Sequence, residues 1–213
     1  MKIKLFATTV LLILSISVFA ISSPTNSAPA NGSTNQFLAV TIDWSNVTGN
    51  AGYIYQLDTT PLFNSTLLRE GPTPANSSQA TMYDLYFGTT YYWRAATKST
   101  VDTSAWSATW SFTTLVTFAN VSPTNGATSQ AVSVTIDWAT VTGNSGYIYQ
   151  IDTTPLFNSS LLREEATPIN SSQATLYDLY FGTQYYWRAA AKTLVDTSDW
   201  SATWNFTTSD LVY

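Results

Sequence analysis

Apolar and polar residues alternate over many short segments of this chain, which is the pattern of β-strands with one buried face. The alternation is clear at residues 40–44 and again at 53–58. Segments rich in Gly, Pro, Asn and Ser separate these runs and are typical of turns. No window places apolar residues at helical spacing for three turns, so the pattern predicts an all-β fold.

A long internal repeat sets the domain organisation. Residues 29–114 align with residues 123–208 at a constant offset of 94 without a gap, and 65 of the 86 aligned positions are identical. Identity this high indicates two copies of one folding unit. Each copy offers about seven short strands with turn signals between them, which favours a sandwich of two sheets.

The most informative segment of each copy is residues 85–96, Leu-Tyr-Phe-Gly-Thr-Thr-Tyr-Tyr-Trp-Arg-Ala-Ala, which returns almost unchanged at 179–190. A turn at Gly88 leads into a strand in which Tyr91, Trp93 and Ala95 take every second position. These residues are therefore predicted to point into the core.

This segment resembles the corner before the sixth strand of fibronectin type III domains. Trp44 stands where that family has a core tryptophan, and Gly52-Tyr53 resembles the opening of its third strand. The closing Trp-Ser-Phe-Thr-Thr at 110–114 resembles bacterial extracellular members. The resemblance implies two tandem seven-stranded fibronectin type III-like β-sandwiches, with a tyrosine corner at Tyr91 and Tyr185.

The start of the chain predicts export. Residues 1–20 combine Lys2 and Lys4, an apolar stretch and small residues before the expected cleavage point, as secretory signal peptides do. We expect an extended lead-in at 21–28, a first module at 29–115 and a second at 116–213, with a further module or domain favoured after it. No integral membrane segment is expected once the signal peptide is removed, and the protein is predicted to be secreted or attached to a bacterial cell surface.

Charge and composition limit the classes of partner that the protein is expected to bind. The 213 residues include 8 basic and 13 acidic side chains, so removal of Lys2 and Lys4 leaves six against thirteen, a net charge of −7. An acidic chain without a basic cluster is not expected to bind nucleic acid or anionic membranes. A protein or glycan at the cell surface is the expected partner, and the modules are expected to be monomeric.

Reactive side chains are few. Histidine and cysteine are absent from the whole sequence, which excludes triads and metal sites built on them. Aspartates at 43, 58, 84 and 102 recur in the second copy, but the strand pattern places Asp43 and Asp58 outward, as solvated side chains. A calcium site at 102–104 would have too few oxygen ligands. The sequence therefore predicts no enzyme and no cofactor.

Aromatic residues divide into a core set and a candidate binding set. The core set is Trp44, Tyr91 and Trp93 with their copies Trp138, Tyr185 and Trp187. The binding set is Trp106, Tyr92 and Arg94 with their copies Trp200, Tyr186 and Arg188. Trp106 follows no strand pattern, so it is either a lid on the sandwich or, with Lys98 and Asp102, a platform for sugars. Arg94 is expected to pair with Asp58 or to stack on a ring.

These observations favour non-catalytic repeat modules that act as a spacer, an adhesion segment or a protein-interaction segment. One alternative is a pair of carbohydrate-binding modules that use Trp106 and Trp200. Another is a pair of accessory domains of a larger secreted enzyme that acts on polysaccharides.

Overall fold

The structure is a computed structural model that describes residues 20–211, so the predicted signal peptide lies outside the described residues except for Ala20. The described part contains sixteen strands and no helix. The first copy holds β1 (Asn26–Ala28), β2 (Ser33–Gln36), β3 (Val40–Trp44), β4 (Gly52–Asp58), β5 (Arg69–Pro74), β6 (Gln79–Met82), β7 (Thr90–Lys98) and β8 (Trp110–Thr114). The second holds β9 (Asn120–Ser122), β10 (Ala127–Gln130), β11 (Val134–Trp138), β12 (Gly146–Asp152), β13 (Arg163–Thr167), β14 (Gln173–Leu176), β15 (Gln184–Lys192) and β16 (Trp204–Thr208).

Each copy folds into a sandwich of a three-stranded and a five-stranded sheet. The first module has the orders β1-β3-β6 and β2-β8-β7-β4-β5, and the second repeats both orders with β9 to β16. All pairings are antiparallel except those of β2 with β8 and β10 with β16. This arrangement confirms the predicted all-β, fibronectin type III-like sandwiches.

The opening strand of each module is divided between the two sheets, which gives eight strands instead of the predicted seven. β1 pairs with β3 in the small sheet, whereas β2 pairs with β8 in the large one. Pro29 lies between them, and proline cannot continue a ladder because it lacks the N–H. The predicted lead-in at 21–28 thus ends in a strand of the sandwich, and the first module begins at or before Asn26 instead of at residue 29.

Aromatic rings fill the space between the sheets. Trp44, Trp93 and Tyr91 are each at most 1% exposed, and their copies Trp138, Trp187 and Tyr185 at most 4%. Trp44 meets Tyr53 edge-on with ring centroids 5.6 Å apart, and Tyr91 stacks on Phe112 at 5.7 Å. Tyr91 also forms the implied corner, because its hydroxyl accepts a hydrogen bond from the Tyr86 N–H at 3.0 Å.

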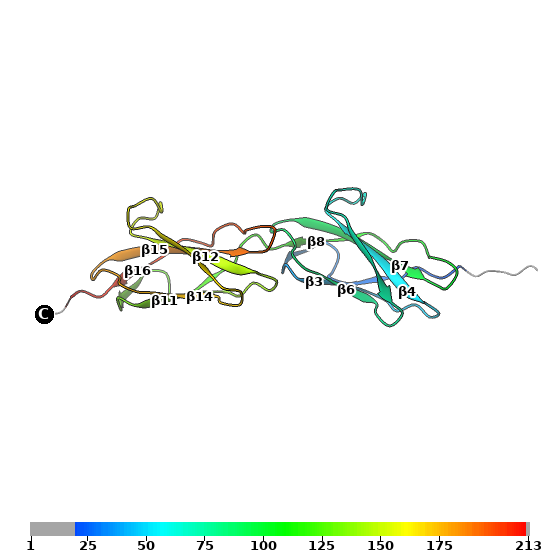
Figure 1. The fold of residues 1–213 in the computed structure, drawn as a ribbon, viewed down its shortest axis with the longest axis horizontal. Helices are drawn as coiled ribbons and strands as arrows, with labels where there is room; N and C mark the ends of the chain where they lie inside the picture. The colour runs from blue at the N-terminus through cyan, green and yellow to red at the C-terminus, as the bar shows by residue number, and fades with distance from the viewer. Residues whose placement is uncertain (1–19, 212–213) are drawn as a thin grey trace, which may run out of the picture.

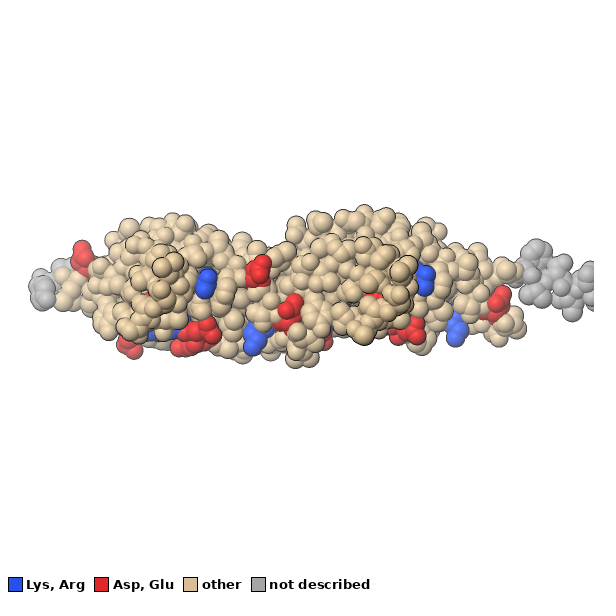
Figure 2. Space-filling view, turned by 90° about the horizontal axis from the view of Figure 1, so that it is seen from above, with Lys and Arg blue, Asp and Glu red and all other residues tan. Residues whose placement is uncertain are grey.

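The two modules lie end to end, with residue 20 and residue 211 at opposite ends of the long axis (Figure 1). The Leu115 N–H donates to the Gln36 carbonyl at 2.9 Å, so Leu115 belongs to the first module. The Phe118 ring packs on Tyr147 of the second at 5.7 Å. The covalent link between the two packed bodies is therefore Val116 and Thr117, and the Thr117 hydroxyl donates to the Trp200 carbonyl of the second module at 3.3 Å. The face in Figure 2 is mostly uncharged, with charged side chains mainly toward its lower edge and a shallow waist between the modules.

Candidate functional site

The outward face of the large sheet carries a stacked arginine in each module. In the first, the Arg94 guanidinium carbon lies 4.0 Å from the centroid of the Phe63 ring and 4.6 Å from that of Trp106. Its Nε and Nη2 donate to Gln56 Oε1 at 2.9 and 2.7 Å. A cation between two aromatic faces is stabilised by the negative π-faces of the rings. Of the two predicted roles for Arg94, stacking is the one the structure shows.

The second module repeats the same contacts. Arg188 lies 4.1 Å from the Phe157 ring centroid and 4.7 Å from that of Trp200. Its Nε donates to Gln150 Oε1 at 2.8 Å. Trp106 and Trp200 are both half-buried, each with Arg beside its ring. Each tryptophan lies in a loop, and the stacked arginine of the neighbouring strand holds its ring in place.

Phe63 is held in place by the loop after β4, and this loop depends on Asp58. The Asp58 carboxylate accepts hydrogen bonds from the Thr59 N–H at 2.7 Å, from the Ser65 N–H at 2.9 Å and from the Ser65 hydroxyl. The loop then sets the Phe63 backbone at a φ of 53°, a region that bulky residues rarely adopt. Phe157 repeats this with a φ of 51°.

The prediction that Asp58 points outward is wrong, because its side chain is fully buried beneath the loop. Burial by itself would raise the pKa of Asp58, but the hydrogen bonds from Ser65 and Thr59 outweigh it and lower the pKa below its ordinary value. The same balance lowers the pKa of Asp152. This carboxylate is therefore a structural anion that organises the loop and not a partner of Arg94.

A groove of about 370 Å³ opens beside Trp106 in the first module. Ile54 and Tyr55 of β4, Glu70 to Pro72 of β5, and Lys98 line it together with Trp106. It offers aromatic surface, one carboxylate and one ammonium group, a combination that suits a polar ligand with an apolar face. Lys98 is thus beside Trp106 as predicted, whereas Asp102 lies in a different hollow at the end of the module.

The second module carries a side chain at the corresponding position. Glu165 stands where the first module has Gly71, and its Oε2 accepts a hydrogen bond from the Tyr149 hydroxyl at 2.8 Å. Tyr149 is 5% exposed. Burial, followed by the bond to the Glu165 carboxylate, raises the pKa of Tyr149 to about 12. At Gly71 an added Cβ would lie 2.9 Å from the Tyr55 hydroxyl, so the glycine keeps the first groove open.

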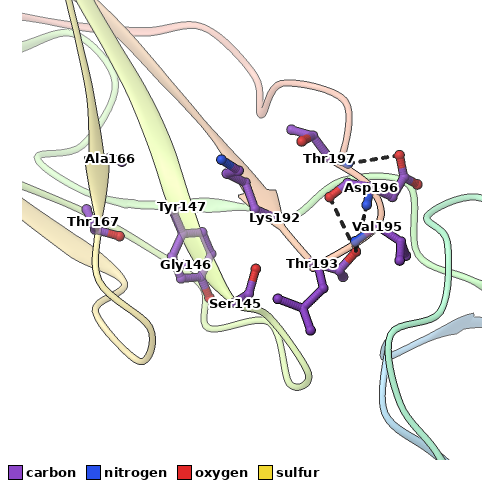
Figure 3. A pocket seen from close by; sticks show the side chains of 11 residues that line it. Ser145, Gly146, Tyr147, Ala166, Thr167, Lys192, Thr193, Val195, Asp196 and Thr197 are labelled. Carbon is purple, nitrogen blue, oxygen red and sulfur yellow. Dashed lines mark hydrogen bonds between the residues drawn. The ribbon is translucent and has the colours of Figure 1, made fainter.

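A larger and more polar groove, of about 550 Å³, lies at the end of the second module that faces the first (Figure 3). The start of β12, the end of β13 and the turn after β15 surround it. Within that turn, the Thr193 hydroxyl accepts from the Asp196 N–H at 2.9 Å, and Asp196 accepts from the Thr197 N–H at 2.8 Å. Figure 3 shows Val195 and Asp196 on the side that faces the first module.

Tyr92 and Tyr186 do not join either stack. Both are half-buried on the large sheet, where Tyr92 lies opposite Asp58 on β4 and Ser111 on β8. The Tyr186 hydroxyl donates to Gln184 Oε1 at 3.0 Å. Phe63 and Phe157 were missed by the sequence reasoning, although the eight residues 58–65 recur without change at 152–159.

Comparisons with known proteins give similarity in structure only. No family model matches the sequence, and no curated protein matches it. The structure is similar to the FN1–FN3 domains of chicken CNTN1, at 17% identity and a TM-score of 0.36 over 88% of this chain and 67% of that one. It is also similar to two fibronectin type III domains of chicken tenascin, at 13% identity and a TM-score of 0.41 over 88% of this chain and 100% of that one. It is the strand order of each module that shows the fold.

Proposed function

We propose that this protein is a non-catalytic, extracellular pair of β-sandwich modules that acts as a spacer or adhesion segment at a bacterial surface. The observation that carries this proposal is the direct contact between the modules. Asp196 of the second accepts a hydrogen bond from the Phe87 N–H of the first at 2.9 Å, and the Leu38 N–H donates to the Thr142 carbonyl at 3.2 Å. Together with a two-residue link, these contacts favour one fixed orientation over a freely jointed one.

The side-chain chemistry is in keeping with this role. The sequence has no histidine or cysteine, and Asp58 and Asp152 are engaged in loop structure. Within residues 20–211, no three acidic, histidine or cysteine side chains gather at one place. The same described part has no helix long and apolar enough to span a membrane.

A distance measurement between the modules tests the spacer. The chain lacks cysteine, so Thr41→Cys and Thr135→Cys give two unique positions for spin labels on equivalent exposed sites of β3 and β11. We expect one narrow distance distribution in electron paramagnetic resonance. A broad distribution would show jointed modules and contradict the spacer. N-terminal sequencing of the exported protein, expected to begin at Ile21, tests its extracellular location separately.

Carbohydrate binding is a second candidate, and the groove beside Trp106 favours it. Sugars commonly stack on an aromatic face while neighbouring polar groups bind their hydroxyls, and here Glu70 and Lys98 flank Trp106 and Tyr55. The proposal concerns the first module, because the second has Glu165 at the position of Gly71.

Gly71→Glu is a sharp test of this second candidate. It gives the first module the residue that the second carries naturally, so we expect it to fold and to close the groove. Polysaccharide pull-down with plant, algal and bacterial glycans should show binding that both Gly71→Glu and Trp106→Ala abolish. The matched variant Trp200→Ala should retain it. Absence of binding by the unaltered protein, or loss in Trp200→Ala alone, would reject the groove as the site.

A further inference from the structure

Each module has a different surface at each of its two ends, and the contact between the modules joins one end surface of each. We define the loop end as the turn after the third strand together with the turn after the seventh, represented in the second module by Thr142, Gly143 and Asp196. The corner end comprises the residues before the third strand and the tyrosine corner, represented in the first module by Leu38, Ala39 and Phe87. At the junction, the loop end of the second module contacts the corner end of the first.

The fit at this junction is close. Gly143 has a φ of +88°, and a Cβ added there would lie 2.7 Å from the Ala39 nitrogen and 2.9 Å from the Leu38 carbonyl carbon. Leu38 is fully buried, and Asp196 Oδ2 accepts from the Phe87 N–H. The backbone of one module therefore lies directly against that of the other.

The equivalent positions lie at the two outer ends of the molecule, where within residues 20–211 no second module covers them. At the free loop end, Thr48, Gly49 and Asp102 are exposed, and nothing lies within 4 Å of a Cβ added to Gly49. At the free corner end, Tyr180 and Phe181 are 58% and 49% exposed, whereas the matching Tyr86 and Phe87 at the junction are only half-exposed or less. Val101 is 83% exposed, against 48% for the matching Val195. Among the hydrogen bonds of residues 20–211, none uses the Phe181 N–H.

We propose that the free corner end of one copy of this chain binds the free loop end of a second copy, in the geometry of the internal junction. The two ends differ from each other, so the contact is heterologous and repeats along the long axis, which produces open linear assemblies. This departs from the monomeric modules expected from the sequence.

The lead-in lies at the edge of this surface, where Ala20, Ile21 and Ser22 line a hollow together with Thr48, Gly49 and Asp102, so a second copy would have to displace its first residues. Ser23 donates to the Ala105 carbonyl at 2.8 Å, and the equivalent linker residue Thr117 donates to the Trp200 carbonyl at 3.3 Å. The two acceptors differ by one position, because Trp200 corresponds to Trp106 and not to Ala105. Thr48, Gly49 and Asp102 remain exposed beside it.

Several substitutions between the copies make the outer contact differ from the inner one, among them Ala131 for Phe37 before the third strand and Thr100 for Leu194 in the turn after the seventh. Val132 and Ser133 replace Leu38 and Ala39, and Asp210 replaces Val116. Asp210 lies against Gly182, just as Val116 lies against Gly88. Gly182 follows Phe181, whose N–H would bind Asp102 of a second copy. Two carboxylates would then be close, and salt that screens their repulsion should strengthen the association. At the internal junction, the short linker gives the two modules an effective concentration in the millimolar range. Separate copies of the protein have no such linker, so their own concentration must reach this range for the outer contact to form.

Sedimentation equilibrium of the purified protein tests the proposal directly. We expect a mass that rises with concentration up to about 1 mM, the range in which the linker acts for the internal junction. Gly49→Asn should lower the association constant at least tenfold, because asparagine tolerates positive φ but its side chain would meet the partner backbone. Asp210→Val, which restores the junction residue, should raise it at least tenfold. Asp43→Ala, on the side of the sandwich, should leave it unchanged. A constant monomer mass at 1 mM, or equal constants for all variants, would overturn the proposal.

Cross-linking distinguishes a head-to-tail contact from any other dimer. Thr48→Cys and Ser133→Cys place single cysteines at the loop end and the corner end of two separately tagged proteins. Oxidation of the mixture should give mainly the mixed dimer, whereas chance collision gives the statistical proportion of mixed and like dimers. A statistical mixture, or a preference for like dimers, would reject the head-to-tail geometry.

Discussion

At the residue scale, Asp58 shows how a carboxylate can serve structure alone. It is fully buried, and its partners are the backbone and hydroxyl groups of the loop that it closes. Because these hydrogen bonds favour the charged form, they lower the pKa in the folded state. The loop in turn presents Phe63 to Arg94, so one buried anion determines the geometry of a surface stack.

Asp58→Asn should destabilise the first module in a pH-dependent way. The folded-state pKa lies below the unfolded value of about 3.9, so the carboxylate contributes fully above that pH and loses its contribution as pH falls through the folded-state pKa. We expect a loss of about 1–3 kcal/mol at pH 7, since buried donors lose their acceptor. Urea unfolding should show the difference shrinking below pH 4. Asp43→Asn serves as the control, and equal stability of Asp58→Asn and wild type at pH 7 would contradict the role.

At the scale of elements, the corner before β7 connects the core to the end of the module. The Tyr91 ring stacks on Phe112 inside the sandwich, while its hydroxyl binds the Tyr86 N–H. The next residue, Phe87, donates its N–H across the junction. The corner therefore fixes both the internal packing and the surface that meets the second module.

Tyr91→Phe should cost on the order of 1 kcal/mol, because it removes one hydrogen bond and leaves the Tyr86 N–H without its acceptor. Chemical denaturation measures the change, with Tyr185→Phe as the equivalent variant in the second module. Tyr83→Phe, at a tyrosine that is 61% exposed, should unfold like wild type. A cost for Tyr83→Phe as large as that for Tyr91→Phe would show that the corner hydrogen bond is not responsible.

The alternating pattern was sufficient to predict the sandwiches and their aromatic core, because the apolar and polar neighbours within a strand indicate which of its residues face inward. It failed for Asp58, which follows inward-facing Leu57 and yet is buried by a loop that folds back over it. It also missed the groove, since closure depends on one glycine in β5 and its replacement by Glu165 in the other copy. Strand periodicity carries no information about such contacts between loops and neighbouring strands.

At the scale of the whole molecule, the junction depends on a glycine that only one of the two modules uses. Gly143 lies against the backbone of Leu38 and Ala39, whereas the equivalent Gly49 has nothing within 4 Å. Both have positive φ, of +88° and +81°. Substituting Gly143 and Gly49 in turn therefore distinguishes the conformational strain of a side chain at positive φ from its effect on the orientation of the modules.

Gly143→Asn should open the junction, while Gly49→Asn should not. Both substitutions place a side chain at a similar backbone conformation, but only at 143 does it collide with the other module. In the dilute, spin-labelled protein, we expect the distance distribution to broaden for Gly143→Asn and to stay narrow for Gly49→Asn. Identical distributions for the two variants would mean that the modules are oriented by something other than this contact.

The two-residue link between Leu115 and Phe118 also determines how the protein would respond to tension. A pull on its opposite ends is directed along the long axis, through the junction (Figure 1). Even with the contacts broken, Val116 and Thr117 at full stretch span only about 7 Å, so little slack is released. Any greater extension requires strands to separate within a sandwich. Under load the pair would therefore behave as a stiff tether whose first large extension is the unfolding of a module.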